Sequence, residues 1–440
     1  IYPLGCCGAP EKNDFNTPVQ HRLKVLIPWL DHIQSLGANA LYLGPVFQSS
    51  SHGYDTVDYY HVDRRLGDNK TLSKFADELH QRGMRLILDA VFNHVGREFW
   101  AFKDVQNYEE NSPYQNWFQN LRFGERSTHG DPFQYEGWQG HTSLVKLNLS
   151  KQEVRDHLFD AVKLWMDLFD IDGLRLDAAD SIDFDFLRAL RDFAKGHRPD
   201  FWLMGEVVHG DYNQWGNPET LDSVTNYESY KGLYSSLKEA NYFEIAHTLG
   251  RQFGPGGIYK GLRLYNFVDN HDVDRVASEL DHTNHLYPLY ILLFTMPGIP
   301  SVYYGSEWGI EGIKEGWSDA SLRPALELDQ IRACAPQAQL PGTIRRLVEI
   351  RAESPALQFG DYQDLFVDHQ QFVFLRSTDQ EQVLVALNSE FKSKVIEISL
   401  PWEDSTLLDL LEPDETFQTL DGSLKLEIPP TWARILRKSH

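Results

Sequence analysis

The sequence predicts a closed parallel (β/α)8 barrel with an insertion after its third strand and an antiparallel β domain at its C-terminal end. Three observations lead to this fold class. Short apolar runs alternate with longer amphipathic segments, eight such runs can be counted, and the pattern changes to residue-by-residue alternation near residue 360. The length of 440 residues suits one large barrel with a small appendage.

The eight apolar runs are interpreted as the barrel strands. They are Ile1 to Leu4, Ala40 to Leu43, Arg85 to Asp89, Gly173 to Asp177, Phe201 to Glu206, Ser223 to Tyr227, Leu264 to Asp269 and Ser301 to Tyr304. Helical spacing between them predicts helices over Leu72 to Arg82, Gln152 to Phe169 and Phe184 to Lys195. Pro28 is expected to begin a short helix that ends before Gly37.

Two stretches interrupt the barrel pattern. Residues 96–150 are rich in polar and aromatic residues without helical spacing, which predicts an insertion. Alternation in Phe372-Val373-Phe374, Val383-Leu384-Val385 and Val395 to Leu400 predicts the β domain. We therefore expect a barrel domain over residues 1–95 and 151–355, an insertion domain over 96–150 and a C-terminal domain over 356–440.

Charge and aromatic content narrow the class of partner. The chain has 41 Lys and Arg against 64 Asp and Glu, a net charge of -23. So acidic a surface repels phosphate backbones and anionic lipids, and we expect neither a nucleic-acid nor a membrane partner. The uncharged run Leu286 to Gly305 contains three prolines, which favours a buried helix and strand over a membrane span. Aromatic residues make up 13%, which fits either a large core or a surface that stacks sugars.

Cysteine usage bears on the compartment. Cys6 and Cys7 are adjacent and Cys334 is distant, so the three cysteines do not form a disulfide framework. This pattern and the absence of a recognisable leader favour the cytoplasm. The chain begins at Ile1 without Met and is interpreted as trimmed, so secretion stays open as an alternative. The sequence does not indicate whether the protein is a monomer or an oligomer.

Polar residues collect at the ends of four predicted strands. The segments are Asp89-Ala-Val-Phe-Asn93-His94, Gly173-Leu-Arg175-Leu-Asp177, Gly205-Glu206-Val207 and Asp269-Asn270-His271-Asp272. In a barrel the carboxyl ends of the strands open to one mouth, where active sites form. A carboxylate that caps a following helix would explain any one of these segments. Four together indicate an active site.

These segments resemble, in order, the four sequence regions of the α-amylase superfamily, glycoside hydrolase family 13. Further motifs agree with it: Gly37 to Phe47, Gly53-Tyr54-Asp55 and Gly298 to Glu307. Lys146-Leu147-Asn148 is similar to a fifth region of the cyclomaltodextrinase, neopullulanase and maltooligosaccharide-hydrolase group, although Val145 stands where a proline is usual. The N-terminal β domain of that group is missing from this sequence.

The resemblance implies a retaining α-glycosidase that hydrolyses α-1,4-glucosidic bonds in starch-derived maltooligosaccharides or dextrins. Asp177 would be the nucleophile that forms a covalent glycosyl intermediate, Glu206 the general acid/base, and Asp272 a third carboxylate that binds sugar hydroxyls. A retaining mechanism requires the Asp177 and Glu206 carboxyl groups to lie roughly 5–5.5 Å apart. We expect all three carboxylates around one anomeric centre.

Four further residues are candidates for substrate binding. Arg175 lies two residues before Asp177, so both side chains point to the same side of a strand, where the guanidinium would keep the nucleophile ionised. Glu206 has no obvious cationic neighbour in the sequence, and we expect apolar surroundings and nearby carboxylates to raise its pKa. His94 and His271 are expected to donate hydrogen bonds to sugar hydroxyls, and Tyr54 to stack on the sugar.

The motifs also depart from the family pattern. Asp180 and Ser181 replace a Lys-His or similar pair that binds the aglycone and calcium in many members. The Asp-rich calcium loop that some members carry after the first strand is absent. We therefore expect no obligatory metal ion and no other cofactor, with calcium as the alternative; Asn93 is either a calcium ligand or a residue that holds its loop.

Two other functions are alternatives to this hydrolase. An α-glucan transglycosylase would use the same covalent intermediate and pass it to a sugar instead of water. A non-catalytic relative, such as the barrel-bearing heavy chain of amino-acid transporters or a carbohydrate-binding protein, would lack part of the carboxylate triad, whereas this sequence has all three acids.

Overall fold

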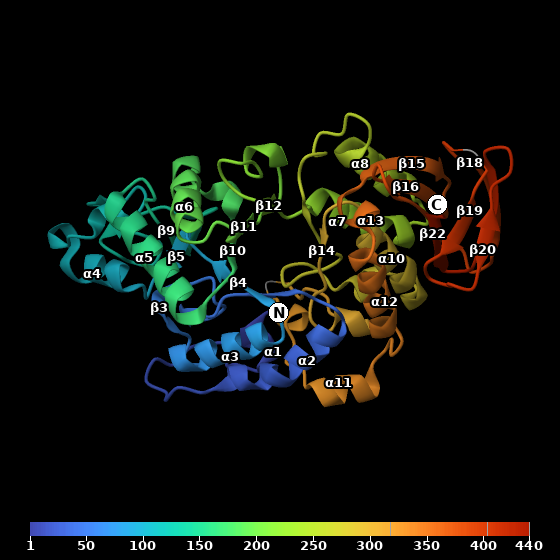
Figure 1. Cartoon of the computed structure of the whole chain (residues 1–440). Coiled ribbons are helices and arrows are strands. Elements are labelled where there is room, and N and C mark those ends of the chain that lie inside the picture. Colours follow the sequence, from blue (N-terminus) through green and yellow to red (C-terminus); the bar gives the residue numbers. More distant parts are fainter. Residues whose placement is uncertain (317, 403, 440) are drawn as a thin grey trace. The chain divides into compact units, whose positions relative to one another are not determined.

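The computed structural model describes residues 1–316, 318–402 and 404–439 (Figure 1). The chain divides into two compact units. The first comprises residues 1–34, 38–224 and 323–326, and the second comprises residues 35–37, 225–322 and 327–440. The domain boundaries expected at residues 95, 150 and 355 stay a prediction.

A five-stranded parallel sheet forms the framework of the first unit. Its order is β1 (Ala40–Leu43), β4 (Arg85–Ala90), β10 (Gly173–Leu176), β11 (Trp202–Gly205) and β12 (Ser223–Val224). All four residues of β10 are buried, as expected for a parallel sheet covered on both faces. The other strands of this unit that lie outside the insertion are β2 (Phe47–Ser49) and β3 (Thr56–Val62), an antiparallel pair.

Helices follow the strands in the order that a βα repeat requires. In the first unit they are α1 (Pro3–Cys6), α2 (Ile27–Ser35), α3 (Asn69–Gln81), α4 (Trp100–Tyr108), α5 (Gln152–Phe169) and α6 (Phe184–His197). Asp68 begins α3 through a capping box with Thr71, and Asp183 caps α6. Their apolar faces, such as Leu72 and Leu79 of α3, are buried.

The insertion has more regular structure than the sequence predicted. β5 (His94–Gly96) pairs with β9 (His141–Lys146), which also pairs with β8 (Gly137–Trp138); β6 (Arg122–Phe123) pairs with β7 (Phe133–Gln134). The expectation of no helical spacing is wrong for α4, which buries Ala101, Phe102 and Val105. Phe102 makes edge contacts with the rings of Phe118 and Phe133 and so holds α4 on the insertion's small core.

The second unit combines a parallel strand pair with an antiparallel domain. β13 (Tyr265–Asn266) pairs in parallel with β14 (Ile299–Pro300). The helices are α7 (Tyr227–Lys238), α8 (Phe243–Phe253), α9 (Val276–Glu279), α10 (Leu286–Thr295), α11 (Leu328–Cys334), α12 (Leu340–Ala352) and α13 (Pro355–Phe359). α10 is apolar on all sides and nearly every one of its residues is buried, in agreement with the expected buried helix.

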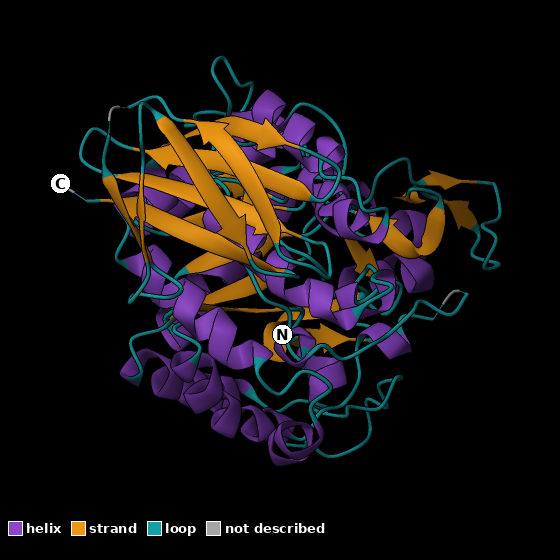
Figure 2. Ribbon diagram, turned by 90° about the vertical axis from the view of Figure 1, so that its right-hand side faces the viewer, coloured by secondary structure: helices purple, strands orange, loops and turns teal. Residues whose placement is uncertain are grey.

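The C-terminal part is an antiparallel β structure, as the alternating pattern predicted (Figure 2). Six strands lie in the order β15 (Asp361–Val367), β16 (Gln371–Ser377), β17 (Gln382–Asn388), β22 (Trp432–Lys438), β19 (Thr406–Asp409) and β20 (Thr416–Gln418). β18 (Lys394–Ser399) pairs with β21 (Ser423–Ile428). The inward residues of both sheets, including Leu384, Leu426 and Leu436, form one apolar cluster.

Two expected strands are corrected by the structure. Pro3–Cys6 is a short helix with Pro3 in its first turn, although Ile1 still bonds to the backbone of Tyr42 and Gly44 beside β1. The last strand lies at Ile299–Pro300 instead of Ser301 to Tyr304, because Ile299 and Pro300 are the residues that pair with β13. Among the described residues, no helix is both long and apolar enough to cross a membrane.

Candidate active site

One buried guanidinium, that of Arg175, binds three carboxylates in the first unit. Its Nη1 lies 3.0 Å from Asp89 Oδ1 and 3.0 Å from Asp177 Oδ1, and its Nη2 lies 2.9 Å from Glu206 Oε2. The strand register explains the cluster: Arg175 is paired with Asp89 of β4, and Leu176 with Gly205 of β11, the residue before Glu206. Neighbouring strand ends therefore deliver the acids to a single cation.

Asp89 is the most buried carboxylate of this cluster. It is 2% exposed and accepts hydrogen bonds from the hydroxyls of Tyr42 at 2.6 Å and Tyr54 at 3.0 Å. Burial raises the pKa of Asp89 above its ordinary value, and Arg175 and the two hydroxyls oppose this rise. Burial also disfavours the charged form of Arg175, but Asp89 and Glu206 hold its pKa well above the usual range.

A strained turn after β10 connects the two outer carboxylates. Ala178 has φ 45°, in the left-handed region, and its N–H donates to Glu206 Oε2 at 3.1 Å. Backbone bonds run from Asp177 N to Ala90 O and from Glu206 N to Leu176 O. A Cβ at Gly205 would lie 2.4 Å from Leu221 Cδ1 and 2.7 Å from Ala179 Cβ, so glycine is what lets this turn pack on β11.

His94, at the start of β5, faces the same cluster. It is 1% exposed, and its Nε2 lies 3.8 Å from Asp177 Oδ2. Its Nδ1 lies 3.2 Å from Asn93 Nδ2, so that with the amide donating, the Nε2 of the neutral ring carries the hydrogen. Burial, aided by His52, lowers the pKa of His94 to about 3. Within the described residues, this Nε2 is buried without a hydrogen-bond partner.

Tyr54 also belongs to this cluster of the first unit. Its ring centroid lies 5.9 Å from the Arg175 guanidinium carbon, and the ring stacks on His52 at a centroid distance of 6.1 Å. The Trp138 ring of the insertion lies 5.4 Å from the His94 ring. The structure therefore brings together five of the seven predicted site residues: Tyr54, His94, Arg175, Asp177 and Glu206.

The remaining two predicted residues, His271 and Asp272, belong to the second unit. His271 Nε2 lies 3.0 Å from Asp272 Oδ2, and the Asp272 N–H donates to Asn270 Oδ1 at 2.8 Å. Asn270 in turn donates to the Tyr227 hydroxyl. The Asp272 side chain is 35% exposed, which leaves its carboxylate accessible to a ligand.

The prediction about the charge next to Glu206 is wrong, and three groups that contact the Arg175 cluster are not identified from the sequence. The expectation that Glu206 has no cationic neighbour is wrong, because Arg175 reaches across from β10 to it. The three groups without a predicted role are Asp89, known from the sequence only as part of a strand-end motif, Tyr42 and the Ala178 amide. The position of Asp89 at a strand end beside Arg175 was the available signal. Among the described residues, no group of three or more His, Cys, Asp or Glu side chains is arranged to hold a metal ion.

Comparison with known proteins identifies the family. Residues 21–337 match the α-amylase catalytic domain, and residues 362–435 match the C-terminal domain of maltogenic amylase. The chain belongs to the α-amylase family. Its predicted fold class, a (β/α)8 barrel with a C-terminal antiparallel domain, and its predicted class, a glycoside hydrolase, are thereby confirmed.

Named relatives of this α-amylase family member are similar over most of the chain. A cyclomaltodextrinase of a Bacillus species is 32% identical over 84% of this chain and 65% of its own length, and neopullulanase 2 of Thermoactinomyces vulgaris is 33% identical over 94% and 70%. The chain thus spans about two thirds of the length of these relatives. The solved cyclic α-maltosyl-(1→6)-maltose hydrolase of Arthrobacter globiformis is 28% identical, with a TM-score of 0.83, and the match covers 100% of this chain and 98% of that one.

Proposed function

We propose that this α-amylase family member is a retaining α-glycosidase that hydrolyses α-1,4-glucosidic bonds in maltooligosaccharides or dextrins. The observation that carries this proposal is the pair of carboxylates, Asp177 and Glu206, on the two outer nitrogens of Arg175. A retaining glycosidase needs one carboxylate to attack the anomeric carbon and one acid to protonate the leaving oxygen. Two adjacent acids on one cation meet that need.

Asp177 is assigned the role of nucleophile. Its oxygen attacks the anomeric carbon, the bond to the leaving oxygen breaks, and Glu206 gives its proton to that oxygen. In the second step Glu206 takes a proton from water, the water oxygen attacks the anomeric carbon, and Asp177 is released. Arg175 lowers the energy of the ionised nucleophile through its 3.0 Å contact.

The charge balance of the cluster favours the uptake of one proton. Asp89, Asp177 and Glu206 carry three negative charges against the single positive charge of Arg175 when all are ionised. Such a cluster takes up a proton more readily than an isolated ion pair, and its titration belongs to the group rather than to one residue. The Ala178 amide at 3.1 Å from Glu206 fixes the orientation of the acid.

Substrate binding is assigned to Tyr54, His94, Arg175 and His271, together with the third carboxylate, Asp272. His94 supports this assignment through a buried Nε2–H that lacks a partner within the described residues, a donor suited to a sugar hydroxyl. Tyr54 offers a ring face, and Arg175 orders Asp177. Asp272 and its neighbour His271 are proposed to bind sugar hydroxyls as the third carboxylate and a donor. The predicted roughly 5–5.5 Å separation of Asp177 and Glu206 stays a prediction.

Substitution of the nucleophile tests the proposal. Asp177→Asn is expected to abolish hydrolysis of maltoheptaose while the far-ultraviolet circular dichroism stays unchanged. Asp185→Asn, which removes one charge from the exposed Arg188 pair on α6, is the matched control and should keep full activity. If Asp177→Asn retains a tenth of the wild-type rate, Asp177 is not the nucleophile. A 5-fluoroglucosyl fluoride should leave a covalent adduct on the peptide that contains Asp177.

Product analysis separates hydrolysis from transfer. At high maltoheptaose concentration a hydrolase yields only shorter sugars of retained anomeric configuration, whereas a transglycosylase also yields longer ones. Starch, pullulan and β-cyclodextrin in the same assay define the substrate range. We also propose a cytoplasmic location, which is supported by the cysteine usage: Cys6 and Cys7 are adjacent and Cys334 is distant, so the three cysteines do not form a disulfide framework.

A further inference from the structure

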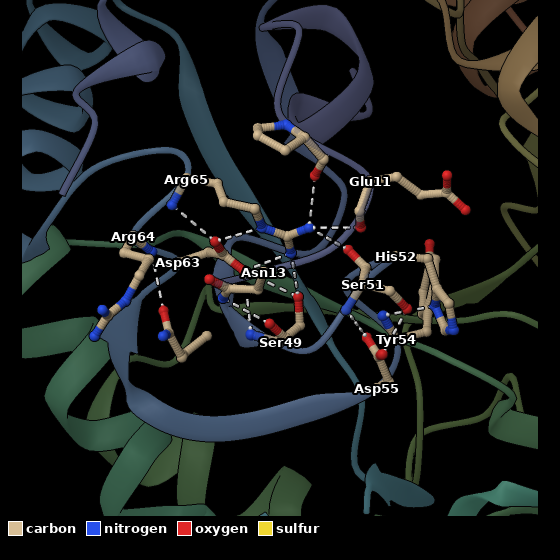
Figure 3. A network of polar contacts seen from close by, with 12 residues as sticks. Glu11, Asn13, Ser49, Ser51, His52, Tyr54, Asp55, Asp63, Arg64 and Arg65 are labelled. Carbon is tan, nitrogen blue, oxygen red and sulfur yellow. Dashed lines mark hydrogen bonds and ion pairs between the residues drawn. The ribbon is translucent and has the colours of Figure 1, made fainter. Parts of the chain in front are cut away.

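A polar network, most of it buried, lies in the first unit beside the loop that carries Tyr54 (Figure 3). We call residues 50–55 the Tyr54 loop and residues 8–20 the N-terminal strap. The strap has no helix or strand, and most of its residues are exposed. Asp63 and Arg65, on the segment after β3, are 0% and 4% exposed and lie between the strap and the loop.

The Arg65 guanidinium connects two separate backbone segments, the strap and the Tyr54 loop, and also binds two side chains. Its Nε and Nη2 bind Asp63 at 2.9 and 2.8 Å, and Nη2 also donates to Ser49 Oγ at 2.9 Å. Its Nη1 donates to the strap carbonyls of Pro10 and Glu11, both at 2.9 Å, and to the Ser51 carbonyl of the Tyr54 loop at 2.6 Å. A planar fork of this kind can hold several acceptors at fixed angles, which a single ammonium cannot.

Internal bonds make the Tyr54 loop stiff once Ser51 is held. The Ser51 N–H and hydroxyl donate to Asp55 at 3.1 and 2.6 Å, and the Tyr54 N–H donates to His52 Nδ1 at 3.2 Å. Gly53 has φ 88°, and a Cβ there would lie 2.6 Å from Pro45 Cβ. A movement of the Ser51 carbonyl therefore shifts the whole loop rather than one residue.

The loop ends on the catalytic cluster. The Tyr54 hydroxyl donates to Asp89, the same carboxylate that Arg175 binds. Loss of the Arg65 contact would let the Tyr54 ring move relative to Asp89 and Arg175. A displacement of about 1 Å in a positioning group can cost about a hundredfold in rate.

We propose that Arg65 is a positioning residue that sets the place of the Tyr54 ring for the saccharide. This inference rests on the proposed function, since it assumes that Tyr54 contacts the sugar. Arg65 itself reaches no substrate: its nitrogens are occupied by Asp63, Ser49 and backbone carbonyls.

Arg64 provides a matched control beside Arg65. Its side chain donates to the strap carbonyls of Phe15 and Thr17, and the Arg64 N–H donates to Gln48. Arg64→Met thus removes an arginine that holds the strap but leaves the Arg65 contact with Ser51 intact. Arg65→Met is expected to lower kcat/KM for maltoheptaose about ten- to hundredfold, whereas Arg64→Met should stay within about twofold of wild type.

A double-mutant cycle with Tyr54→Ala decides whether Arg65 acts through Tyr54. If it does, Arg65→Met should lower kcat/KM of the Tyr54→Ala protein by no more than about twofold, because the ring it positions is already gone. Losses that multiply would overturn the inference, and so would wild-type kcat/KM in Arg65→Met. Unchanged kcat/KM in Tyr54→Ala alone would instead contradict the proposed binding role of Tyr54.

A conservative variant covers the case in which Arg65→Met does not fold. Arg65→Lys keeps the charge opposite Asp63 but cannot hold Ser51, Pro10 and Glu11 together. It is expected to show a smaller loss of kcat/KM than the methionine variant and the same dependence on Tyr54. Full wild-type kcat/KM in Arg65→Lys would show that the fork is not needed and overturn the inference.

Discussion

Lowering the pH from 7 to 4.5 should destabilise the protein through His94 in particular. In the folded chain the ring is buried, and its pKa is about 3 against an ordinary value of 6.5. The unfolded chain therefore binds a proton between these two values that the folded chain rejects. Stability from this group is complete above pH 6.5 and is lost as the pH falls towards 3, because protonation then favours the unfolded state.

The size of the effect follows from the two pKa values. At pH 7 the ring is mostly neutral in both states, so the linkage term is close to zero. At pH 4.5 the unfolded ring is almost fully charged while the folded ring is neutral, and the free energy of unfolding falls by about 2.5 kcal/mol relative to pH 7. That is a large share of the stability of a typical domain.

Urea unfolding of the wild type and of His94→Gln at both pH values isolates this contribution. Glutamine is neutral throughout, so the variant should lose about 2.5 kcal/mol less than the wild type between pH 7 and 4.5. His157 and His285, whose pKa values are also lowered by burial, are present in both proteins and cancel. An equal pH dependence in the two proteins would refute the argument that His94 is buried in its neutral form.

Three further outcomes are expected. Tyr54→Ala should lower kcat/KM about ten- to hundredfold. Tyr54→Phe should lower it less, since this variant keeps the ring and loses only the hydrogen bond to Asp89, a contact worth about 1.5–3 kcal/mol. Equal kcat/KM values for the two variants would show that the ring does not contribute to the site. Gly205→Ala should destabilise by about 1–3 kcal/mol in thermal unfolding because its Cβ meets Leu221 and Ala179, whereas Gly196→Ala, with nothing within 4 Å, should not; similar unfolding temperatures for the two would contradict the packing at Gly205. Prolonged treatment with EDTA should leave turnover intact, and a loss reversed by calcium would show that a metal is required.

Local patterns predicted those elements whose burial follows from their own sequence. The bounds of β1 and α5 agree with the prediction. The short apolar run of β1 and the long amphipathic pattern of α5 can both be recognised in the sequence. Ile1 to Leu4 and Ser301 to Tyr304 failed because pairing with a distant strand, not local apolarity, decides where a short strand lies. α4 was not predicted because only three of its residues are buried, and the polar residues between them obscure the helical periodicity.

The residues of the candidate site could be predicted from the sequence, but the contacts between them could not. Asp177, Arg175 and Glu206 could be named from strand-end motifs. The contact of Arg175 with Glu206 depends on the register of β10 against β11, which no single segment encodes. The same holds for Tyr42 of β1, whose hydroxyl reaches Asp89 on the neighbouring strand β4.

The left-handed turn at Ala178 restricts how this enzyme can be redesigned. Its φ of 45° is tolerated by glycine, asparagine and aspartate, and is costly for β-branched side chains. Ala178 directly follows Asp177, and its N–H donates to Glu206. A valine introduced at position 178 would therefore disturb the positions of both carboxylates. Mutant libraries aimed at new sugar acceptors should therefore vary the residues beyond it and leave position 178 alone.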